Sequence, residues 1–284
     1  MTRRILVALD PDSDTPIAVQ TAIDIAKRHD AELTGLAFVD REAIERDTIG
    51  GGIGSMYFAE KLRDDLKEET RNRAVDLVRA FATRVEAAGV RHTRDAISED
   101  GLVQSIVDAM RVHDLLIAGR ESHFYYANPS RRTHTLAQVL EQSAAATLII
   151  GTEPVDVRRI AVAYDGSAAA ARALQKFAHL APFGNDATVE VVHARGGTDA
   201  DRLASDRLLD DAALYLSAYG FDHVETTSVE SVDPTEIIVG LGTDGRADLV
   251  VSGAYAKTGL KRFVFGSSAT RLLDEATVPL FLYH

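Results

Sequence analysis

The 284-residue chain contains two copies of one pattern. Residues 3–10 (RRILVALD) are echoed 155 residues later by residues 158–165 (RRIAVAYD), and residues 114–119 (DLLIAG) are echoed 134 residues later by residues 248–253 (DLVVSG). The order of these landmarks is the same in both halves. A repeat of this size predicts two domains of one fold rather than a single large domain. We expect the first domain over residues 1–152 and the second over residues 153–284.

The two copies differ in length. The two offsets differ by 21 residues, so the first copy carries 21 additional residues between its landmarks. We place this insertion near residues 41–60, which include Gly50-Gly51-Gly52-Ile53-Gly54. Because glycine leaves the backbone many conformations, this stretch predicts an irregular segment rather than a helix or strand.

Short apolar runs alternate with amphipathic stretches in both halves. Apolar runs such as residues 160–164, 189–192 and 249–252 suit parallel strands that are covered on both faces. Residues 61–88 show apolar positions at spacings of three and four, which predicts a helix with one buried face. Alternating strands and helices with right-handed crossovers predict an α/β fold, with a doubly wound parallel sheet in each half.

The position of one helix shows that a glycine motif in the second half is not a dinucleotide site. Asp233 followed by Pro234 predicts the start of a helix, because aspartate caps helices and proline suits the first helical position. Residues 240–245 (GLGTDG) match the glycine pattern of dinucleotide sites. That pattern should follow a strand and open a helix, whereas here it ends a helix and precedes a strand. We therefore interpret these glycines as a loop.

Composition excludes several classes of protein. The formal net charge is −12, which disfavours binding to nucleic acid or to an anionic membrane surface. The chain has no cysteine, so it has neither a thiol redox centre nor a thiolate metal site. No stretch has the length of a signal peptide or of a membrane span. We therefore expect a cytoplasmic protein without a nucleic-acid or membrane partner.

Two strand ends in the second half carry distinctive residues. Open parallel sheets bind ligands beyond the carboxyl ends of their strands, where the strand order reverses. Residues 164–167 (YDGS) and 252–259 (SGAYAKTG) would flank that point if their strands are neighbours. Residues 266–270 (GSSAT) then lead into a helix, whose free amides and hydroxyls suit either a phosphate or an ordinary helix cap.

The spacing of these residues resembles a family signature. Gly253, Ala256 and Gly266-Ser267 resemble the nucleotide-binding signature of the universal stress protein family, Gly-x2-Gly-x9-Gly-(Ser/Thr), with alanine at the second glycine. Both halves are similar to this family, so the chain resembles a tandem UspA-like protein. The resemblance implies five parallel strands per half in the order 3-2-1-4-5, the adenine nucleotide alpha-hydrolase-like fold. It also implies binding of ATP or a related adenine nucleotide, with or without Mg²⁺.

The resemblance also implies roles for individual residues. Residues bordering the adenine and ribose would be Ala163 and Asp165, and the backbone of Ala194 would meet the base. Residues lining the phosphate path or holding the phosphates would be Gly253, Tyr255, Ala256, Gly266, Ser267 and Ser268. The β-carbon of Ala256 predicts weak or nucleotide-selective binding, because it would crowd a site where the family has glycine.

The first half departs further from the family. It keeps Asp10, but Pro11-Asp12 replaces the Gly-Ser turn, and no Gly-(Ser/Thr) pair follows Gly119. We expect its nucleotide site to be degenerate. Alternatives that stay open are a different anion site and a solvated loop, both formed by Arg120, Arg131, Arg132 and His134. Asp10 and Asp165 could hold Mg²⁺ or cap their own turns, and His193 suits a structural role.

Three functional hypotheses follow. The first is a nucleotide-binding sensor or switch of the stress response, read by an unknown regulatory protein. The second is a nucleotide-free dimerisation scaffold, and the third is a weak ATP hydrolase, which ranks lowest because no general base is evident. As in the family's dimers, the final strands at residues 147–150 and 280–283 would pair edge to edge within the chain, which could then form a homodimer.

Overall fold

The computed structural model describes residues 2–13, 15–39, 44–45, 56–93, 96–99, 101–120, 135–154, 156–231, 233–253 and 267–284. These residues form two compact units. The N-terminal unit is Arg3–Ala144, and the C-terminal unit is Met1–Thr2 with Ala145–His284. The strand before residue 152 belongs to the C-terminal unit by its contacts, so a domain boundary at residue 152 stays a prediction.

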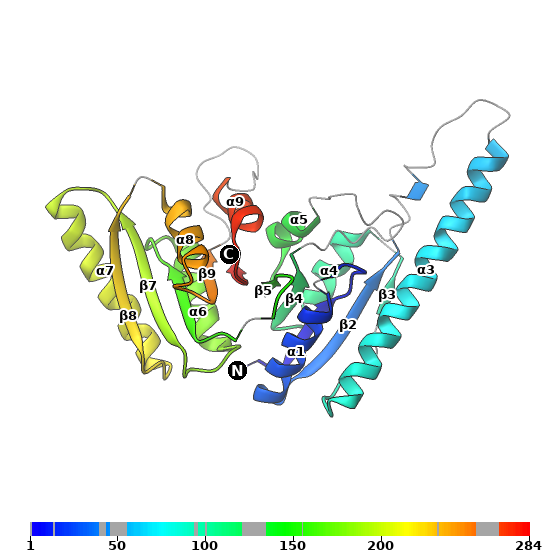
Figure 1. Ribbon diagram of the computed structural model, residues 1–284, viewed down its shortest axis with the longest axis horizontal. Coiled ribbons are helices and arrows are strands. Elements are labelled where there is room, and N and C mark those ends of the chain that lie inside the picture. The colour runs from blue at the N-terminus through cyan, green and yellow to red at the C-terminus, as the bar shows by residue number, and fades with distance from the viewer. Residues whose placement is uncertain are drawn as a thin grey trace. The chain divides into compact units, whose positions relative to one another are not determined.

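The N-terminal unit is a parallel sheet with helices on its faces (Figure 1). Its strands are β1 (Arg4–Ala8), β2 (Glu32–Phe38), β3 (Ala96–Ser98) and β4 (Leu115–Gly119). Its helices are α1 (Thr15–His29), α3 (Met56–Ala87), α4 (Leu102–Met110) and α5 (Thr135–Gln142). The strands lie in the order β3-β2-β1-β4. In chain order this is 3-2-1-4, which agrees with the order that the family resemblance implies.

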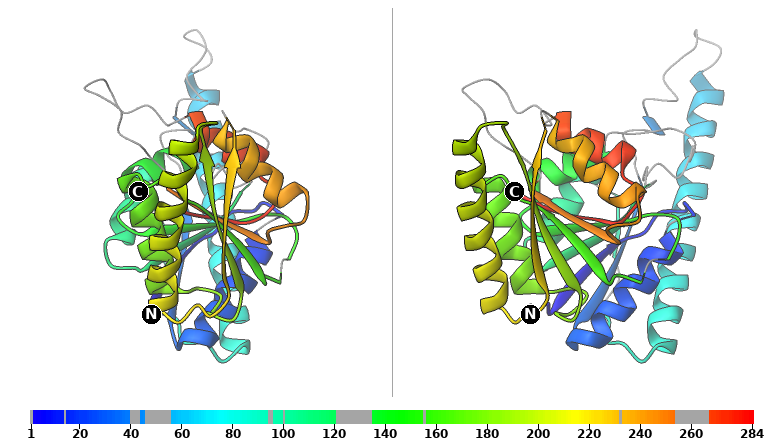
Figure 2. Two further views of the ribbon diagram at one scale, coloured as in Figure 1. Left: turned by 90° about the vertical axis from the view of Figure 1, so that its left-hand side faces the viewer. Right: turned by 60° about the vertical axis from the view of Figure 1, so that its left-hand side comes forward.

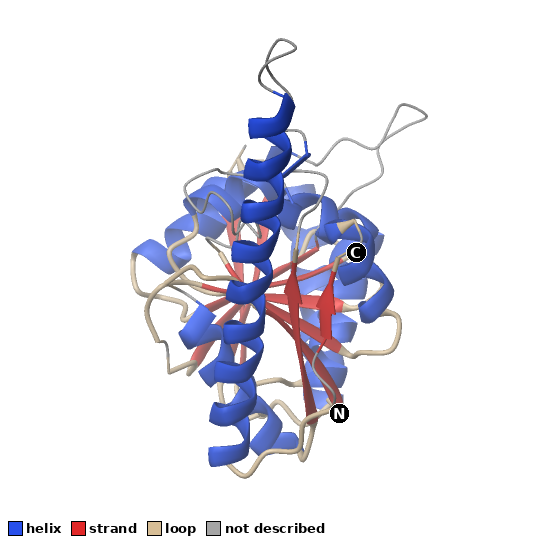
Figure 3. Cartoon of the chain, turned by 90° about the vertical axis from the view of Figure 1, so that its right-hand side faces the viewer, coloured by secondary structure: helices blue, strands red, loops and turns tan. Residues whose placement is uncertain are grey.

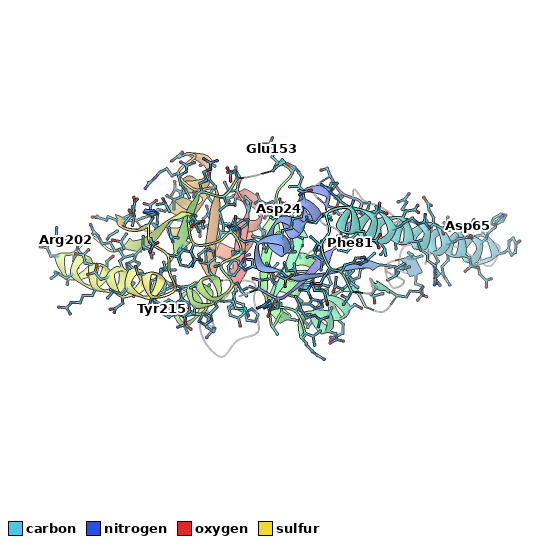
Figure 4. The ribbon with its side chains drawn as sticks, turned by 90° about the horizontal axis from the view of Figure 1, so that it is seen from below. Asp24, Asp65, Phe81, Glu153, Arg202 and Tyr215 are labelled. Carbon is cyan, nitrogen blue, oxygen red and sulfur yellow. The ribbon has the colours of Figure 1, made fainter. Side chains whose placement is uncertain are left out.

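Helix α3 differs from the helix expected over residues 61–88. It begins at Met56, so the end of the stretch expected to be irregular is helical. Figure 3 shows α3 running past the end of the sheet. Figure 4 shows Asp65 on the projecting part and Phe81 where the helix meets the sheet. Phe81 is 2% exposed, whereas Leu62 is 52% exposed. The prediction of one buried face is therefore wrong for Leu62, because none of the strands that the structure describes lies beneath that end of the helix.

The C-terminal unit contains the remaining strands and helices. Its strands are β5 (Ala146–Ile150), β6 (Arg159–Ala163), β7 (Thr188–Arg195), β8 (Val224–Glu230), β9 (Leu249–Gly253) and β10 (Leu280–Tyr283). Its helices are α6 (Ala168–Leu180), α7 (Asp199–Ala218), α8 (Pro234–Thr243) and α9 (Ser267–Glu275). Helices α6 and α7 cover one face of the sheet, and α8 and α9 cover the other (Figure 2). The order β8-β7-β6-β9-β10 confirms the predicted 3-2-1-4-5 winding.

Strand β5 pairs with β10 in an antiparallel arrangement. Leu280 is opposite Ile149, and Leu282 is opposite Thr147. These are the two final strands of the repeats, so their predicted edge-to-edge pairing within the chain is confirmed. Beneath α6, the ring of Phe177 lies 5.5 Å from the ring centres of both Phe221 and Phe281. This aromatic cluster anchors the core of the unit.

A polar anchor is repeated along with the strands. The carboxylate of Asp114 accepts the backbone amides of Arg3 and Arg4 at 2.8 and 3.0 Å. Asp248 accepts the amides of Arg158 and Arg159 at 3.1 and 2.9 Å, and also the Arg159 guanidinium. Each aspartate therefore ties the start of one strand to the start of its neighbour. This explains why the sequence repeat includes the aspartate.

Candidate functional site

The carboxyl ends of β6, β7 and β9 lie side by side. Strand β6 pairs with β9, with Val162 opposite Val251, and with β7, with Ala163 opposite Val192. From β6 the chain winds outward to β7 on one side, while β9 lies on the other. The two distinctive strand ends therefore flank the point where strand order reverses, as the sequence predicts. Among the expected site residues, Ala163, Asp165, Ala194 and Gly253 all lie at this edge.

Asp165 stands in a tight turn between β6 and α6. Its carboxylate accepts the backbone N–H of Ser167 at 2.9 Å. Gly166 has a φ of +74°, which favours glycine, and Ser167 caps α6 by accepting the amide of Ala170 at 3.1 Å. The Asp165 side chain nevertheless stays exposed. The turn thus fixes a carboxylate at the edge of the sheet and leaves it accessible.

Gly253 has a packing reason to be glycine. A β-carbon at this position would lie 2.7 Å from the carbonyl carbon of Ala169 and 2.8 Å from the amide nitrogen of Ala170. Both atoms belong to the backbone of the first turn of α6, so neither can move away easily. Strand β9 can therefore pass beneath α6 only with glycine at its end. The family resemblance places Gly253 along the phosphate path, and no local pattern in the sequence indicates this close approach.

A hydrogen-bonded network lies at the end of β7. His193 Nδ1 is 2.8 Å from the hydroxyl of Ser205, which donates to the hydroxyl of Ser228 at 3.0 Å. Burial lowers the pKa of His193, and the nearby charge of Asp165 opposes that shift. His193 is thus a partnered structural histidine, as its position in the sequence suggests. No sequence signal connects the two serines, because they come from different elements.

The phosphate side of the predicted site is described only in part. Ser267 and Ser268 form the start of α9. Tyr255, Ala256 and Gly266 lie outside the described residues. The backbone amides at the start of a helix favour an anion, so the position of α9 is compatible with the predicted role of these serines. That role stays a prediction.

The aspartate at the equivalent edge of the N-terminal unit is buried. Asp10 makes the same kind of turn, accepting the amide of Asp12 at 3.3 Å, but it is only 2% exposed. At or shortly after the ends of β1 and β2, four apolar residues are buried as well: Leu9, Phe38, Val39 and Ile44. Residues 121–134, which hold Arg131, Arg132 and His134, lie outside the described residues. The two copies therefore present the same aspartate in opposite environments.

Other classes of site find no support in the part of the chain that the structure describes. In that part, no three His, Asp or Glu side chains gather as a metal site would require. No helix there is long and apolar enough to cross a bilayer. The glycine motif at residues 240–245 closes α8 and precedes β9, which confirms the order of elements that excludes a dinucleotide site. The prediction of a loop is wrong for residues 240–243, because they form the last turn of α8.

Comparisons with known proteins agree with this architecture. The sequence model of the universal stress protein family matches residues 1–150 and 156–284. A universal stress protein from Archaeoglobus fulgidus DSM 4304 superposes with a TM-score of 0.68 at 16% identity, covering 99% of this chain and 98% of that one.

Two proteins of Pseudomonas aeruginosa also superpose over most of the chain. A putative universal stress protein from strain UCBPP-PA14 gives a TM-score of 0.60 at 20% identity, covering 99% of this chain and 92% of that one. A functionally unknown protein from strain PAO1 gives 0.61 at 19% identity with the same coverage. No curated protein matches the chain in sequence. At these identities the structures support the fold alone.

Proposed function

The chain belongs to the universal stress protein family, whose sequence model covers both halves, and from this premise we propose that it is a nucleotide-binding regulator of the stress response. Its C-terminal half binds ATP or a related adenine nucleotide at the carboxyl ends of β6, β7 and β9. Its N-terminal half has lost the equivalent site. Occupancy of the site changes a surface that a regulatory protein reads.

The observation that carries this proposal is the contrast between Asp165 and Asp10. Both stand at the end of the first strand of their copy, but Asp165 is exposed at the reversal of strand order, whereas Asp10 is 2% exposed. An exposed carboxylate held in a rigid turn can accept hydrogen bonds from ribose hydroxyls. Only the C-terminal half has both such a carboxylate and the glycine and serine residues of the family signature.

The remaining expected residues contact different parts of the nucleotide. The backbone of Ala194, near the end of β7, offers hydrogen bonds to the base. The backbone amides at the start of α9, together with Gly266, Ser267 and Ser268, bind the phosphates, where the partial positive charge of the helix start favours an anion. Ala163 and Gly253 lie beneath the nucleotide, and Tyr255 and Ala256 line its phosphate path. A Mg²⁺ ion would accompany the phosphates.

The site supports binding more than catalysis. A hydrolase needs a group that activates water near the terminal phosphate. In the proposed arrangement the Asp165 carboxylate contacts the ribose, away from the terminal phosphate. His193 is engaged with Ser205 through Nδ1. The proposed role is that of a sensor rather than an enzyme. In this proposal the protein acts in the cytoplasm as a homodimer, and a separate regulatory protein binds to it.

Release of bound ligand from the purified, denatured protein and its identification by mass spectrometry tests this proposal directly. Stoichiometric adenine nucleotide is the expected result, and calorimetry should show that Ser267→Ala with Ser268→Ala weakens ATP binding. Ser217→Ala, at an exposed position of α7, serves as the matched control. An absence of nucleotide, together with no thermal shift in ATP, would favour the nucleotide-free scaffold. Steady phosphate release that Ser267→Ala abolishes would favour the hydrolase.

A further inference from the structure

Helix α9 is tied to helix α8 by an ion pair. The guanidinium of Arg271 donates to Oδ2 of Asp233 at 2.7 Å. Arg271 lies one turn after Ser267, so it sits directly behind the part of α9 that binds phosphate in the proposed function. Asp233 is the N-cap of α8, and its other oxygen accepts the amides of Thr235 and Glu236. One carboxylate thus caps α8 and holds α9.

A second contact lies between the end of α8 and the segment that follows α9. A β-carbon at Gly242, near the end of α8, would lie 2.9 Å from Cγ2 of Val278, which follows α9 in the chain. Leu272 of α9 is 3% exposed. Arg271, in the middle of α9, is therefore tied to the N-cap residue of α8, and the segment after α9 packs closely against the end of α8. We expect a change at Asp233 to alter the position of α9 without removing the packing of the segment that follows it.

The same aspartate is connected to the opposite side of the proposed site. The amide of Asp233 donates to the hydroxyl of Ser231 at 3.1 Å, and the amide of Ser231 donates to the carbonyl of Arg195 at 3.2 Å. Arg195 directly follows Ala194, the residue expected to meet the base. Hydrogen bonds thus run from the base side of the site to the helix on its phosphate side.

Arg271 is engaged by carboxylates on both sides. Its Nε and Nη2 donate to the two oxygens of Glu275 at 3.1 and 3.3 Å, while Nη1 donates to Asp233. The hydrogen bond from Arg271 lowers the pKa of Asp233, so the pair is ionised at neutral pH. With its donors directed at two carboxylates, this guanidinium is placed to orient a helix rather than to bind a phosphate.

We infer that Arg271 and Asp233 form a positioning pair that sets the start of α9 relative to the bound nucleotide and so controls recognition of its phosphates. The inference rests on the proposed function and deepens it. The pair contributes to the affinity for ATP and leaves the affinity for adenosine unchanged, because adenosine has no group that reaches α9.

Binding of ATP and of adenosine to the full chain and its variants tests the inference. Asp233→Asn keeps a side-chain oxygen that can cap α8 but removes the charge that holds Arg271. We expect its ATP affinity to fall about threefold to fivefold, the size of the coupling across a partly exposed ion pair, with adenosine affinity unchanged. Arg271→Gln should have the same effect, and Arg271→Lys should restore part of the loss. Glu275→Gln removes the other partner of Arg271 without touching α8 and should change neither affinity.

Each other outcome has a distinct meaning. A gain of ATP affinity in Asp233→Asn would show that the released guanidinium binds phosphate directly, which overturns the inference. Equal losses for ATP and adenosine would show a merely structural role, and unchanged affinity would show no role; both overturn it. If the unaltered chain binds neither ATP nor adenosine, the proposed function itself fails and the inference fails with it.

Discussion

A β-carbon on Gly253 would lie 2.7 Å from the carbonyl carbon of Ala169, because β9 ends directly beneath the first turn of α6. We expect Gly253→Ala to lower the free energy of unfolding by about 1–3 kcal/mol, the usual cost of forcing extra atoms into a packed region. Chemical denaturation measures this. Gly240→Ala is the matched control, since nothing lies within 4 Å of its β-carbon. Equal effects of the two substitutions would contradict the packing role of Gly253.

Substitutions in the buried part of α3 should cost much more stability than substitutions in its exposed part. Phe81 is 2% exposed and lies against Gly35 of β2, whereas Leu62 is 52% exposed. Phe81→Ala should therefore lower the free energy of unfolding by about 3–5 kcal/mol. Leu62→Ala should change it by less than about 0.5 kcal/mol. Thermal and chemical denaturation of both variants check this, and a large loss in Leu62→Ala would show that the projecting end is packed in solution.

The anchor at Asp248 predicts a loss of stability in acid. Burial opposes ionisation of this carboxyl, but hydrogen bonds from the Arg159 side chain and from the amides of Arg158 and Arg159 outweigh it and lower its pKa. A carboxyl whose pKa is lowered in the folded state stabilises the protein at pH values above its pKa in the unfolded state, which is about 3.9. That stabilisation is lost as the pH falls through the folded-state pKa.

Asp248→Asn should therefore be less stable than the unaltered protein at pH 7, with the difference shrinking below about pH 4. The measurement is the free energy of unfolding from denaturant titrations across this pH range. Asp244→Asn, at an exposed position after α8, should follow the unaltered protein throughout. A difference for Asp248→Asn that is constant with pH would argue against this role of the carboxylate.

His193 reports the charge of Asp165. Burial lowers the pKa of His193, and the Asp165 carboxylate partly counteracts this. Asp165→Asn removes the opposing charge, so the pKa of His193 should fall further below its ordinary value of about 6.5. Titration of the ring protons by NMR measures it. The pKa of His113, which burial also lowers but which shows no effect of Asp165, should stay constant. A rise in the pKa of His193 would contradict the proximity of Asp165 to its ring.

Ala256 tests the phosphate side of the site. It occupies the second glycine position of the family signature, where a β-carbon costs about 1 kcal/mol if φ is positive. Ala256→Gly should then tighten ATP binding about fivefold. Ala254→Gly changes a neighbouring position outside the signature and should have no such effect. Calorimetry compares the two variants, and identical ATP affinity in Ala256→Gly and the unaltered protein would reject the prediction.

Much of the fold was predictable from the sequence because the relevant signals are local and occur twice. The apolar runs around Ile5 and Ile160 are short and bounded, which is typical of buried parallel strands. The helix start at Asp233-Pro234 was predictable for the same reason, since capping depends on residues within one turn. The repeat then required the same order of elements in each half.

Only the residues of the candidate site that stand at the ends of strands were predictable from the sequence. Asp165 and Gly253 mark the ends of β6 and β9, and the parallel pairing of these strands brings them to one edge. The network of His193, Ser205 and Ser228 was not predictable, because its members come from β7, α7 and β8 and share no spacing.

The sequence by itself determined the repeat, the parallel winding, the turn at Asp165 and the family, because these depend on short patterns whose physical meaning is the same in any context. Only the tertiary structure decided which aspartate is accessible. Asp10 and Asp165 stand in matching positions and make similar turns, yet one is buried and the other exposed. Tertiary packing also made glycine necessary at Gly253 and joined Arg271 to Asp233. Burial and close approach depend on residues distant in the chain, which no local pattern records.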